Sequence, residues 1–320
     1  MALDQWRQQL QRFGAEHPGP ARAVHDFDAD GLCSAALWKL ATQGDLMVAP
    51  SRQILPVLEA DLAAVYLLDL SCPEQAFPWS SATVVIDHHP PPERLPNCLM
   101  LNTHDWKPPA CTSLLTHWLY FGEHSPHAWI AAAGALSDLG DKAEFPLLQN
   151  SLKQWGLPKM RKLTSLINSA HRAEGDCQPA IDALLEHSDP LSLLRSDHPG
   201  VVYLRECQDR VRRRLNHARS AHPLFFGNLA VVQFASDCPV QSIIAQIWRT
   251  RLPTHIVLVA NQRTDRPVVQ LSARSKAPLH AIQFLQERGL SVKGHAGSAG
   301  AVLSPEQWEL FLVTQHASYP

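Results

Sequence analysis

The sequence contains no long hydrophobic run and no excess of either charge. No window approaches the roughly 18 consecutive apolar residues that span a membrane, and residues 1–14 form a polar helical pattern without the apolar core of a secretory signal. The formal net charge is −2, so the chain has no general attraction for nucleic acid, and a polyanion must be held by a local patch or by metal ions. We therefore expect a cytoplasmic protein with no membrane partner.

Paired cysteines are also absent. The seven cysteines are scattered along the chain without a Cys-x-x-Cys motif, which indicates free thiols in a reducing compartment and argues against a disulfide framework or a zinc site. With 320 residues, 45% of them hydrophobic and 18% charged, the chain has the composition of a globular protein and the length of two domains.

The chain does contain polar clusters at the ends of short apolar segments. The β-branched residues 83–86 run directly into Asp87, His88 and His89, and the segment stops at Pro90. Such a run, closed by proline, predicts a buried strand with the polar cluster at its carboxyl end. In open α/β sheets, ligands bind at that edge. A pair of buried structural histidines is the alternative interpretation.

A second cluster follows the strand predicted at 21–24. His25, Asp28 and Asp30 lie within six positions, and Gly31 permits a tight turn into the helix that comes next. Imidazole and carboxylate groups gathered at a strand end are suitable metal ligands. Aspartates that cap the helix, beside an unrelated histidine, would produce the same pattern.

Two further carboxylates occupy comparable positions. Asp69 closes the strand predicted at 64–68, although an isolated aspartate there is more often a turn former. Asp138 lies near the end of a helix of small residues predicted at 128–140, where burying a carboxylate without a cation is costly. Four segments would then deliver six metal ligands to one sheet edge: His25, Asp28, Asp30, Asp69, His88 and Asp138.

This ligand set has a chemical preference. Several carboxylates cannot all ionise at short range without cations between them. Oxygen ligands with few imidazoles and no thiolates favour Mn²⁺, or Mg²⁺, over a structural zinc, and two such ions about 3.5–4 Å apart promote phosphoryl transfer to water. We therefore infer a binuclear phosphoesterase in which a metal-bridging hydroxide attacks phosphorus.

The C-terminal part of the chain shows the α/β pattern again on a smaller scale. Beyond Pro223 the sequence predicts strands at 229–234, 256–260 and 268–273, helices at 240–251 and 279–287, and a Gly-rich turn at 294–300. Small residues in that turn let a phosphate approach backbone amides, and Arg274 offers bidentate contacts. The arginine-rich helix predicted at 201–220 is either a solvated connector or the wall of a polyanion groove.

In order and spacing, these motifs resemble the DHH phosphoesterase superfamily in its DHH plus DHHA1 form. The resemblance rests on His-x-x-Asp-x-Asp-Gly at 25–31, Asp69, Asp87-His88-His89, Asp138, Ser-Ala-Arg-Ser at 272–275 and Gly-His-x-x-Ser-Ala-Gly at 294–300. It implies an α/β fold with three parts: an N-terminal DHH domain whose mainly parallel sheet is flanked by helices (1–200), a connector helix (201–222) and a smaller α/β DHHA1 domain (223–320).

The resemblance also implies roles for individual residues. His25 and Asp28 would hold one metal ion, and Asp30, His88 and Asp138 would hold the other. Asp69 would bridge the two ions. His89 would act on the scissile phosphate or the leaving oxygen, and Asp87 would support the site. The substrate phosphate would be held by the second domain through Arg274, Gly294, His295 and Ser298. Lys293 replaces a glycine that the family usually has, which puts the geometry of this loop in question.

Two branches of the family suggest different substrates. RecJ-like exonucleases share the spacing of the first motif, whereas compact nanoRNase-like and bisphosphonucleotide phosphatase members share the length of this chain. We expect release of mononucleotides from short single-stranded nucleic acid. A nucleotide 3′-phosphatase, a cyclic-dinucleotide phosphodiesterase and a polyphosphate or pyrophosphate hydrolase are enzymatic alternatives, and a non-catalytic nucleotide-binding scaffold is an alternative of another class. A homodimer is left open.

Overall fold

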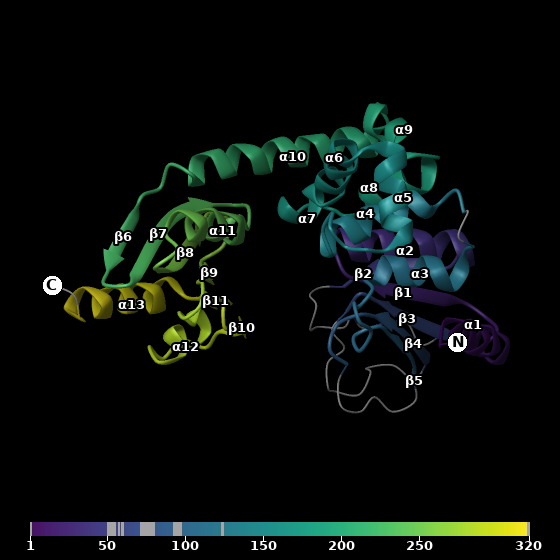
Figure 1. Ribbon diagram of the computed structural model, residues 1–320, viewed down its shortest axis with the longest axis horizontal. Helices are drawn as coiled ribbons and strands as arrows, with labels where there is room; N and C mark the ends of the chain where they lie inside the picture. Colours follow the sequence, from purple (N-terminus) through teal and green to yellow (C-terminus); the bar gives the residue numbers. More distant parts are fainter. Residues whose placement is uncertain are drawn as a thin grey trace. The chain divides into compact units, whose positions relative to one another are not determined.

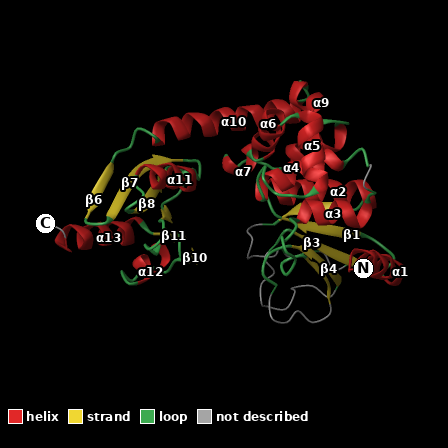
Figure 2. Ribbon diagram, viewed as in Figure 1, coloured by secondary structure: helices red, strands yellow, loops and turns green. Residues whose placement is uncertain are grey.

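The computed structural model describes residues 2–49, 56, 58, 61–70, 81–91, 98–122 and 125–318. The chain divides into two compact units (Figure 1). Unit 1 comprises Met1–His171 and Asp176–Arg205, and unit 2 comprises Arg172–Gly175 and Glu206–Pro320. Each unit is built around its own β-sheet (Figure 2). The four-residue segment Arg172–Gly175 belongs to unit 2 although its neighbours on both sides belong to unit 1.

Unit 1 contains a five-stranded sheet in which all strands are parallel. In the spatial order β2-β1-β3-β4-β5, the strands are Asp45–Val48, Ala21–His25, Ala64–Leu68, Ala82–Asp87 and Cys98–Asn102. The chain turns to one side of β1 to form β2 and to the other side to form β3, so the loops that leave β1 and β3 diverge. The predicted α/β class with a parallel sheet is confirmed.

Ten helices of the described residues accompany this sheet or lead away from it. They are α1 (Ala2–Glu16), α2 (Ala29–Thr42), α3 (Thr112–Tyr120), α4 (Ala128–Asp138), α5 (Pro146–Trp155), α6 (Leu157–Ile167), α7 (Ser169–Arg172), α8 (Gln178–Glu186), α9 (Pro190–Arg195) and α10 (Pro199–Ala218). Helix α2 is buried over its first ten residues and packs against α3, α4 and α8 as well as the sheet.

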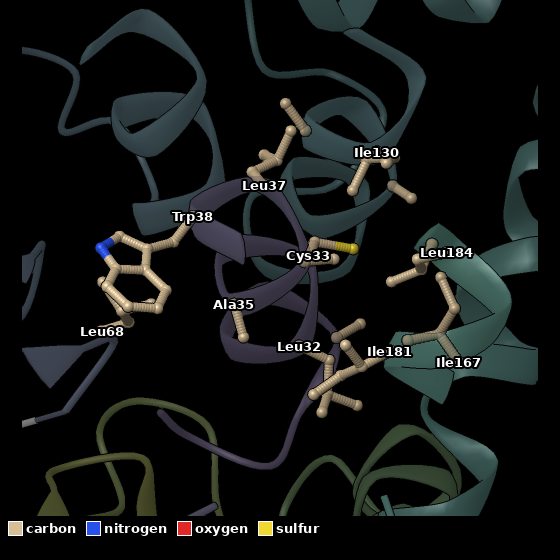
Figure 3. Close-up of a cluster of buried hydrophobic side chains, with 14 of the residues drawn as sticks. Leu32, Cys33, Ala35, Leu37, Trp38, Leu68, Ile130, Ile167, Ile181 and Leu184 are labelled. Carbon is tan, nitrogen blue, oxygen red and sulfur yellow. The ribbon is translucent and has the colours of Figure 1, made fainter. Parts of the chain in front are cut away.

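Alternate side chains of the strands point to opposite faces of the sheet, as the two-residue period of a strand requires. Leu68 and Ile86 belong to the large core that contains the helices, whereas Leu67 and Val85 belong to a smaller cluster on the other face. Both faces are therefore apolar, which explains why these strands are continuous hydrophobic runs in the sequence. Figure 3 shows side chains of α2 packed between Leu68 and residues of α4, α6 and α8.

Strand β5 occupies a segment for which the sequence predicted no strand. The segment contains cysteine, leucine, methionine and asparagine but no β-branched residue, so its local preference for strand is weak. Its strand conformation comes from tertiary pairing with β4, in the register Asp87 to Asn102, and from burial of Leu101. Strand β2 has a similarly weak local signal.

Unit 2 contains a six-stranded mixed sheet. In the order β10-β11-β9-β8-β7-β6, the strands are Lys293–His295, Ser298–Leu303, Val269–Arg274, Ile256–Arg263, Leu229–Ser236 and Pro223–Phe226. Strands β7 and β8 are parallel and joined by α11 (Gln241–Arg251), whereas the other neighbours are antiparallel. Helices α12 (Ala281–Gln286) and α13 (Pro305–Ser318) complete the unit.

The Gly-rich segment of unit 2 is a β-hairpin and not the open turn expected from its composition. Gly294 pairs with Ala299, and Ala296 and Gly297 form the turn. Gly294 has a φ of +142°, and a Cβ at this position would lie 2.9 Å from the Cα of Ala299. Glycine is therefore required by close backbone pairing at this position.

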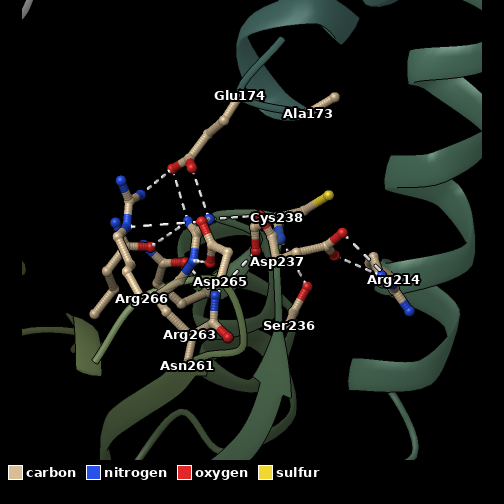
Figure 4. A network of polar contacts seen from close by, with 12 residues as sticks. Ala173, Glu174, Arg214, Ser236, Asp237, Cys238, Asn261, Arg263, Asp265 and Arg266 are labelled. Carbon is tan, nitrogen blue, oxygen red and sulfur yellow. Dashed lines mark hydrogen bonds and ion pairs between the residues drawn. The ribbon is translucent and has the colours of Figure 1, made fainter. Parts of the chain in front are cut away.

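A buried arginine, Arg263, lies at the centre of a network of ion pairs in unit 2 (Figure 4). The side chain of Arg263 is fully buried and makes a bidentate ion pair with Glu174, at 2.7 and 2.6 Å. It also pairs with Asp265 at 2.9 Å, and Arg266 pairs with Glu174 at 2.5 Å. We call these four residues the Arg263 network. The network holds the segment Arg172–Gly175 to unit 2.

Helix α10 is the arginine-rich helix predicted from the sequence. Arg212 pairs with Asp209 at 2.9 Å and Arg214 pairs with Asp237 at 2.6 Å. Because carboxylates already balance these guanidinium groups, the solvated connector is favoured over the polyanion wall. Within the described ranges, neither α10 nor any other helix has the length and apolar character needed to cross a bilayer.

Candidate metal site

The polar ends of β1, β3 and β4 lie next to one another at the carboxyl edge of the sheet. At this edge the connection after β1 runs to one side and the connection to β3 runs to the other. The backbone amide of Asp26 donates to the carbonyl of Leu68, and that of Asp69 donates to the carbonyl of Ile86, both at 3.1 Å. The sheet pairing thus continues one residue beyond β1 and β3. This pairing fixes Asp26, Asp69 and Asp87 side by side at the carboxyl edge of the sheet.

The segment between β1 and α2 holds carboxylates at the start of a helix. Asp28 is the N-cap of α2, and its side chain accepts hydrogen bonds from the amides of Asp30 (2.9 Å) and Gly31 (3.3 Å). A Cβ at position 31 would lie 2.6 Å from the carbonyl oxygen of Asp26, so this turn requires glycine. The cap that the sequence allowed is present, and Asp28 also contributes a carboxylate oxygen to one of the ligand groups described below.

Asp30 is buried and is held by the backbone of a different helix. Its carboxylate accepts hydrogen bonds from the amides of Thr112 (2.8 Å) and Ser113 (3.0 Å), the first residues of α3. The partial positive charge of a helix N-terminus stabilises a carboxylate at this position. The orientation of Asp30 is therefore fixed by main-chain atoms.

Gly134 of α4 provides the space for this arrangement. A Cβ at position 134 would lie 2.8 Å from Oδ1 of Asp30 and even nearer to the side chain of Ser113. We expect a Gly134→Ala variant to lose about 1–3 kcal/mol of folding stability through overpacking and to bind divalent metal less tightly. Denaturant unfolding and Mn²⁺ titration would measure both effects.

The matched control for this variant is Gly14→Ala in α1, where a Cβ would meet nothing within 4 Å. That change should be neutral or slightly stabilising, because alanine is the better helix former. Equal effects of the two substitutions would contradict the packing explanation.

Asp69 occupies a backbone conformation that few residues adopt. Its φ is +62°, in the left-handed region where aspartate and asparagine are the least disfavoured residues after glycine. The carboxylate is buried, accepts a hydrogen bond from the hydroxyl of Thr112 (2.9 Å) and lies 3.2 Å from Nε2 of His88. Strained residues of this kind concentrate at functional sites.

The two adjacent histidines have different surroundings. His88 lies between Asp69 and Asp138, with Nδ1 at 3.7 Å from Oδ2 of Asp138. His89 points Nδ1 at Oδ1 of Asp87, at 2.8 Å. A carboxylate can only accept, so Nδ1 of His89 carries the proton and Nε2 is directed away from Asp87. Asp87 thus orients the imidazole of His89.

Three groups of side chains have ligand atoms that all lie within 4.8 Å of one another. The groups are Asp69, Asp87, His88 and His89; Asp30, His88 and Asp138; and Asp26, Asp28 and Asp69. Asp69 and His88 each belong to two groups, so the groups are contiguous. Carboxylates with one or two imidazoles fit a hard divalent cation such as Mn²⁺ or Mg²⁺.

Asp26 belongs to one of these groups, although it was not predicted from the sequence. His25 was predicted as a ligand, but it is in none of the groups found among the described residues. Both residues are buried at the end of β1. Nδ1 of His25 donates to the carbonyl of Asp26 at 2.7 Å, and burial lowers the His25 pKa to about 4. His25 is therefore neutral with its lone pair on Nε2. The two-residue spacing of Asp26, Asp28 and Asp30 is the signal that could have identified Asp26.

The electrostatics of the cluster call for a cation. Burial raises the pKa of Asp69 well above its ordinary value, and the nearby charges of Asp30 and Asp28 raise it further. Burial and the charge of Asp30 also raise the pKa of Asp138, against the opposite effect of His88. Without cations these acids resist ionisation, and a bound divalent ion would reverse that tendency.

The predicted substrate residues lie together in unit 2. Arg274 ends β9, pairs with Ser298 of β11 and is followed by Ser275, whose amide donates to the carbonyl of Gly297 in the hairpin turn. Gly294 of β10 pairs with Ala299 of β11 in the same hairpin. His295 is in β10, but its side chain lies outside what the structure describes.

Several solved structures share this fold. RecJ from Thermus thermophilus in complex with Mn²⁺ matches with a TM-score of 0.68 at 18% sequence identity, over 99% of this chain and 54% of RecJ. This chain thus matches about half the length of that protein. A manganese-bound exonuclease RecJ gives 0.67 at 19% identity, covering 99% and 94% of the two chains. The pGpG-specific phosphodiesterase PggH from Vibrio cholerae gives 0.53 at 16%, covering 94% and 100%.

These likenesses establish the architecture. The chain has the RecJ fold, which is the fold that its motifs suggested. Neither a protein-family model nor a curated protein sequence matches the chain.

Proposed function

We propose that this protein is a metal-dependent phosphodiesterase that degrades short single-stranded nucleic acid to mononucleotides. The observation that carries the proposal is the pair of contiguous ligand groups at the sheet edge, Asp26, Asp28 and Asp69 beside Asp30, His88 and Asp138. Two groups of this composition suit two divalent ions, Mn²⁺ preferred and Mg²⁺ tolerated. Asp69 belongs to the first group and lies 3.2 Å from His88 of the second, so it is our candidate for the bridging ligand. The RecJ and PggH folds support the reaction class.

The chain's own residues account for the other steps. Bound divalent ions would supply Lewis acidity to the phosphoryl group. His89, whose Nδ1 proton is held by Asp87, can present a protonated Nε2 to the leaving oxygen as a general acid. Two backbone amides of α3 hold the carboxylate of Asp30 in place. Asp30 would therefore not reorient when negative charge develops on the phosphoryl group during the reaction.

Unit 2 offers a binding site for the substrate phosphate. This site includes Arg249, which was not predicted from the sequence, beside the predicted Arg274. Register places Arg274 opposite Val257, at the start of β8, and Arg249 lies in the last turn of α11, just before β8. The two guanidinium groups are close enough that Arg249 lowers the pKa of Arg274, after the larger effect of burial. Within the described residues, neither forms an ion pair, and Nε of Arg249 is buried without a hydrogen-bond partner. Two uncompensated cations favour an anionic ligand.

An Arg249→Gln variant should therefore raise KM for a phosphate-bearing oligonucleotide about tenfold while leaving kcat nearly unchanged, because a charge-assisted contact is worth about 1.5–3 kcal/mol. Steady-state hydrolysis would separate the two constants. Arg251→Gln is the control from the same helix turn, since Arg251 is exposed and stacks on Trp248 at 5.1 Å. An equal rise in KM for both variants would remove Arg249 from the site.

The function is tested by Mn²⁺-dependent hydrolysis of a matched substrate set. The set holds 5′-labelled RNA and DNA of two, five and twenty residues, a cyclic dinucleotide and adenosine 3′,5′-bisphosphate, with an Asp69→Ala/His88→Ala double variant as the blank. Mononucleotides released from the short strands, and absent from the blank, would support the proposal. Binding of metal and nucleotide without any hydrolysis would replace it with the nucleotide-binding scaffold.

A dinucleotide is the second candidate substrate. This chain matches the full length of PggH, whose name specifies a phosphodiesterase acting on pGpG. Preferential cleavage of the two-residue strands in the same set would favour this narrower activity over the exonuclease.

A further inference from the structure

Unit 1 has an aromatic pocket that the metal site does not use. It measures about 660 Å³ and lies between α1, the loop after β5, the end of α3 and the start of α5. Its apolar walls include Trp106, Trp118 and Phe121, and its polar groups include Arg7 and Asn150. The volume and this mixture of aromatic walls with a few polar groups are typical of small-molecule sites.

The aromatic rings are held in a fixed, nearly parallel arrangement. Trp106 stacks on Trp6 with ring centroids 5.3 Å apart and an angle of 10° between the planes. Trp118 follows at 6.3 Å from Trp106, with an angle of 21°. Trp106 and Trp118 line the pocket with nearly parallel indole rings, and aromatic walls of this kind suit a planar ring rather than a flexible aliphatic chain.

The described residues that line the pocket carry charge of one sign. Arg7 is the charged residue among its lining groups, and the guanidinium is anchored by two hydrogen bonds to the carbonyl of Trp118, at 2.8 and 2.6 Å. A third N–H reaches Asp4 at 3.3 Å, a pair that is largely exposed and therefore weak. Two of the five N–H groups of Arg7 are left for an anion.

Asn150 adds a second polar contact at the wall of the pocket. Its side chain is exposed, and its amide forms no hydrogen bond with the residues that the structure describes. A carboxamide can both donate and accept, as the edge of a nucleobase requires. The lining thus combines flat aromatic surfaces, a fixed cation and an unused amide.

We propose that this pocket binds a nucleoside monophosphate unit, with the base against Trp106 and Trp118 and the phosphate at Arg7. The choice of ligand rests on the proposed function, since mononucleotides would be its products. The same unit could come from a free nucleotide, which would make the pocket regulatory, or from one residue of a strand, which would make it a substrate anchor.

Equilibrium dialysis of the full-length protein in EDTA would test the proposal, because binding is then measured without hydrolysis. The ligands are AMP, ribose 5-phosphate and an eight-residue oligoadenylate. We expect AMP or the oligoadenylate to bind at least about tenfold more tightly than ribose 5-phosphate, because stacking on an aromatic side chain contributes strongly for a base. If AMP binds and the oligoadenylate does not, the ligand of the pocket is a free nucleotide. If the oligoadenylate binds and AMP does not, the ligand is one residue of a strand.

Three variants locate the bound ligand. Trp106→Leu should weaken binding about tenfold or more. Asn150→Asp and Asn150→Lys change only an exposed side chain, so they should fold normally and shift affinity for the phosphate-bearing ligand in opposite directions, weaker and tighter, by a few fold each. Arg251→Gln in unit 2, an exposed arginine outside both proposed sites, should leave this binding intact.

Two results would overturn the proposal. One is nucleotide binding that is unchanged in Trp106→Leu and in both Asn150 variants. The other is ribose 5-phosphate binding as tightly as AMP. Failure of the phosphodiesterase proposal is separate, because it would appear as absent hydrolysis in the substrate set while dialysis still showed Trp106-dependent binding.

Discussion

An Asp69→Asn variant is expected to lose at least about a hundredfold in hydrolysis, since even residues that only support a metal ligand contribute roughly 10–100-fold. Asp69 belongs to two of the three ligand groups and lies beside His88 of the third, and we propose it as the ligand that both ions share. Asparagine keeps the shape of the side chain and tolerates the positive φ of position 69. It removes the charge, so metal affinity should fall while the fold persists.

The same variant should melt at a higher temperature than the wild type in metal-free buffer, because an amide carries no buried charge that neighbouring acids repel. Mn²⁺ titration, hydrolysis and thermal melting measure the three effects. Asp141→Asn is the matched control, since Asp141 lies one turn beyond Asp138 and pairs with Arg161 at the surface. If Asp69→Asn kept more than a tenth of the activity, Asp69 could not be a shared metal ligand.

The second large effect concerns stability, pH and metal. Asp69 and Asp138 have pKa values raised above the ordinary value of 3.8, chiefly by burial. An acid with a raised pKa stabilises the folded state while it is protonated, so this contribution is lost as pH rises from about 3.8 through the folded-state pKa. Metal binds the ionised form and should restore the loss.

The stabilisation by Mn²⁺ should therefore be larger at pH 8 than at pH 5, reaching about 4 kcal/mol when the free ion exceeds its Kd a thousandfold. Melting curves with Mn²⁺ and with EDTA, compared at each pH, measure it. The comparison cancels the contribution of His117, which belongs to none of the ligand groups. Burial lowers the pKa of His117 to about 4, so its effect on stability opposes that of the acids as pH falls below 6.5. A pH-independent difference would show that the ion does not bind these carboxylates.

The fold was predictable wherever the sequence had strong local patterns. The runs before Asp69 and Asp87 are buried on both faces, so each is a continuous apolar segment that ends at the functional edge. Strands β2 and β5 were not predicted, because neither carries a strong β preference and pairing with a neighbour decides their conformation. The hairpin at Gly294 was expected as a turn, since composition does not reveal pairing with Ala299.

The candidate site was predictable in its location and less so in its membership. Strand ends identify Asp28, Asp69 and His88, because all carboxyl ends of a parallel sheet share one edge. Side-chain direction beyond a strand end depends on the turn, and the turn at Gly31 packs against Asp26. Sequence spacing could not show which of His25 and Asp26 reaches the other ligands, nor that Thr112 and Ser113 would hold Asp30.

The Arg263 network bears on how such a protein can be rearranged over evolutionary time. Arg263 lies at the end of β8, downstream of α10, whereas its bidentate partner Glu174 lies upstream of α10. A single recombination event within α10 would deliver residues 206–320 to a new gene without Glu174 and leave a buried guanidinium short of one carboxylate. Losing a partner from a buried ion pair costs about 3–5 kcal/mol. The C-terminal unit should therefore be inherited together with the loop that completes it, not as a freely exchangeable module.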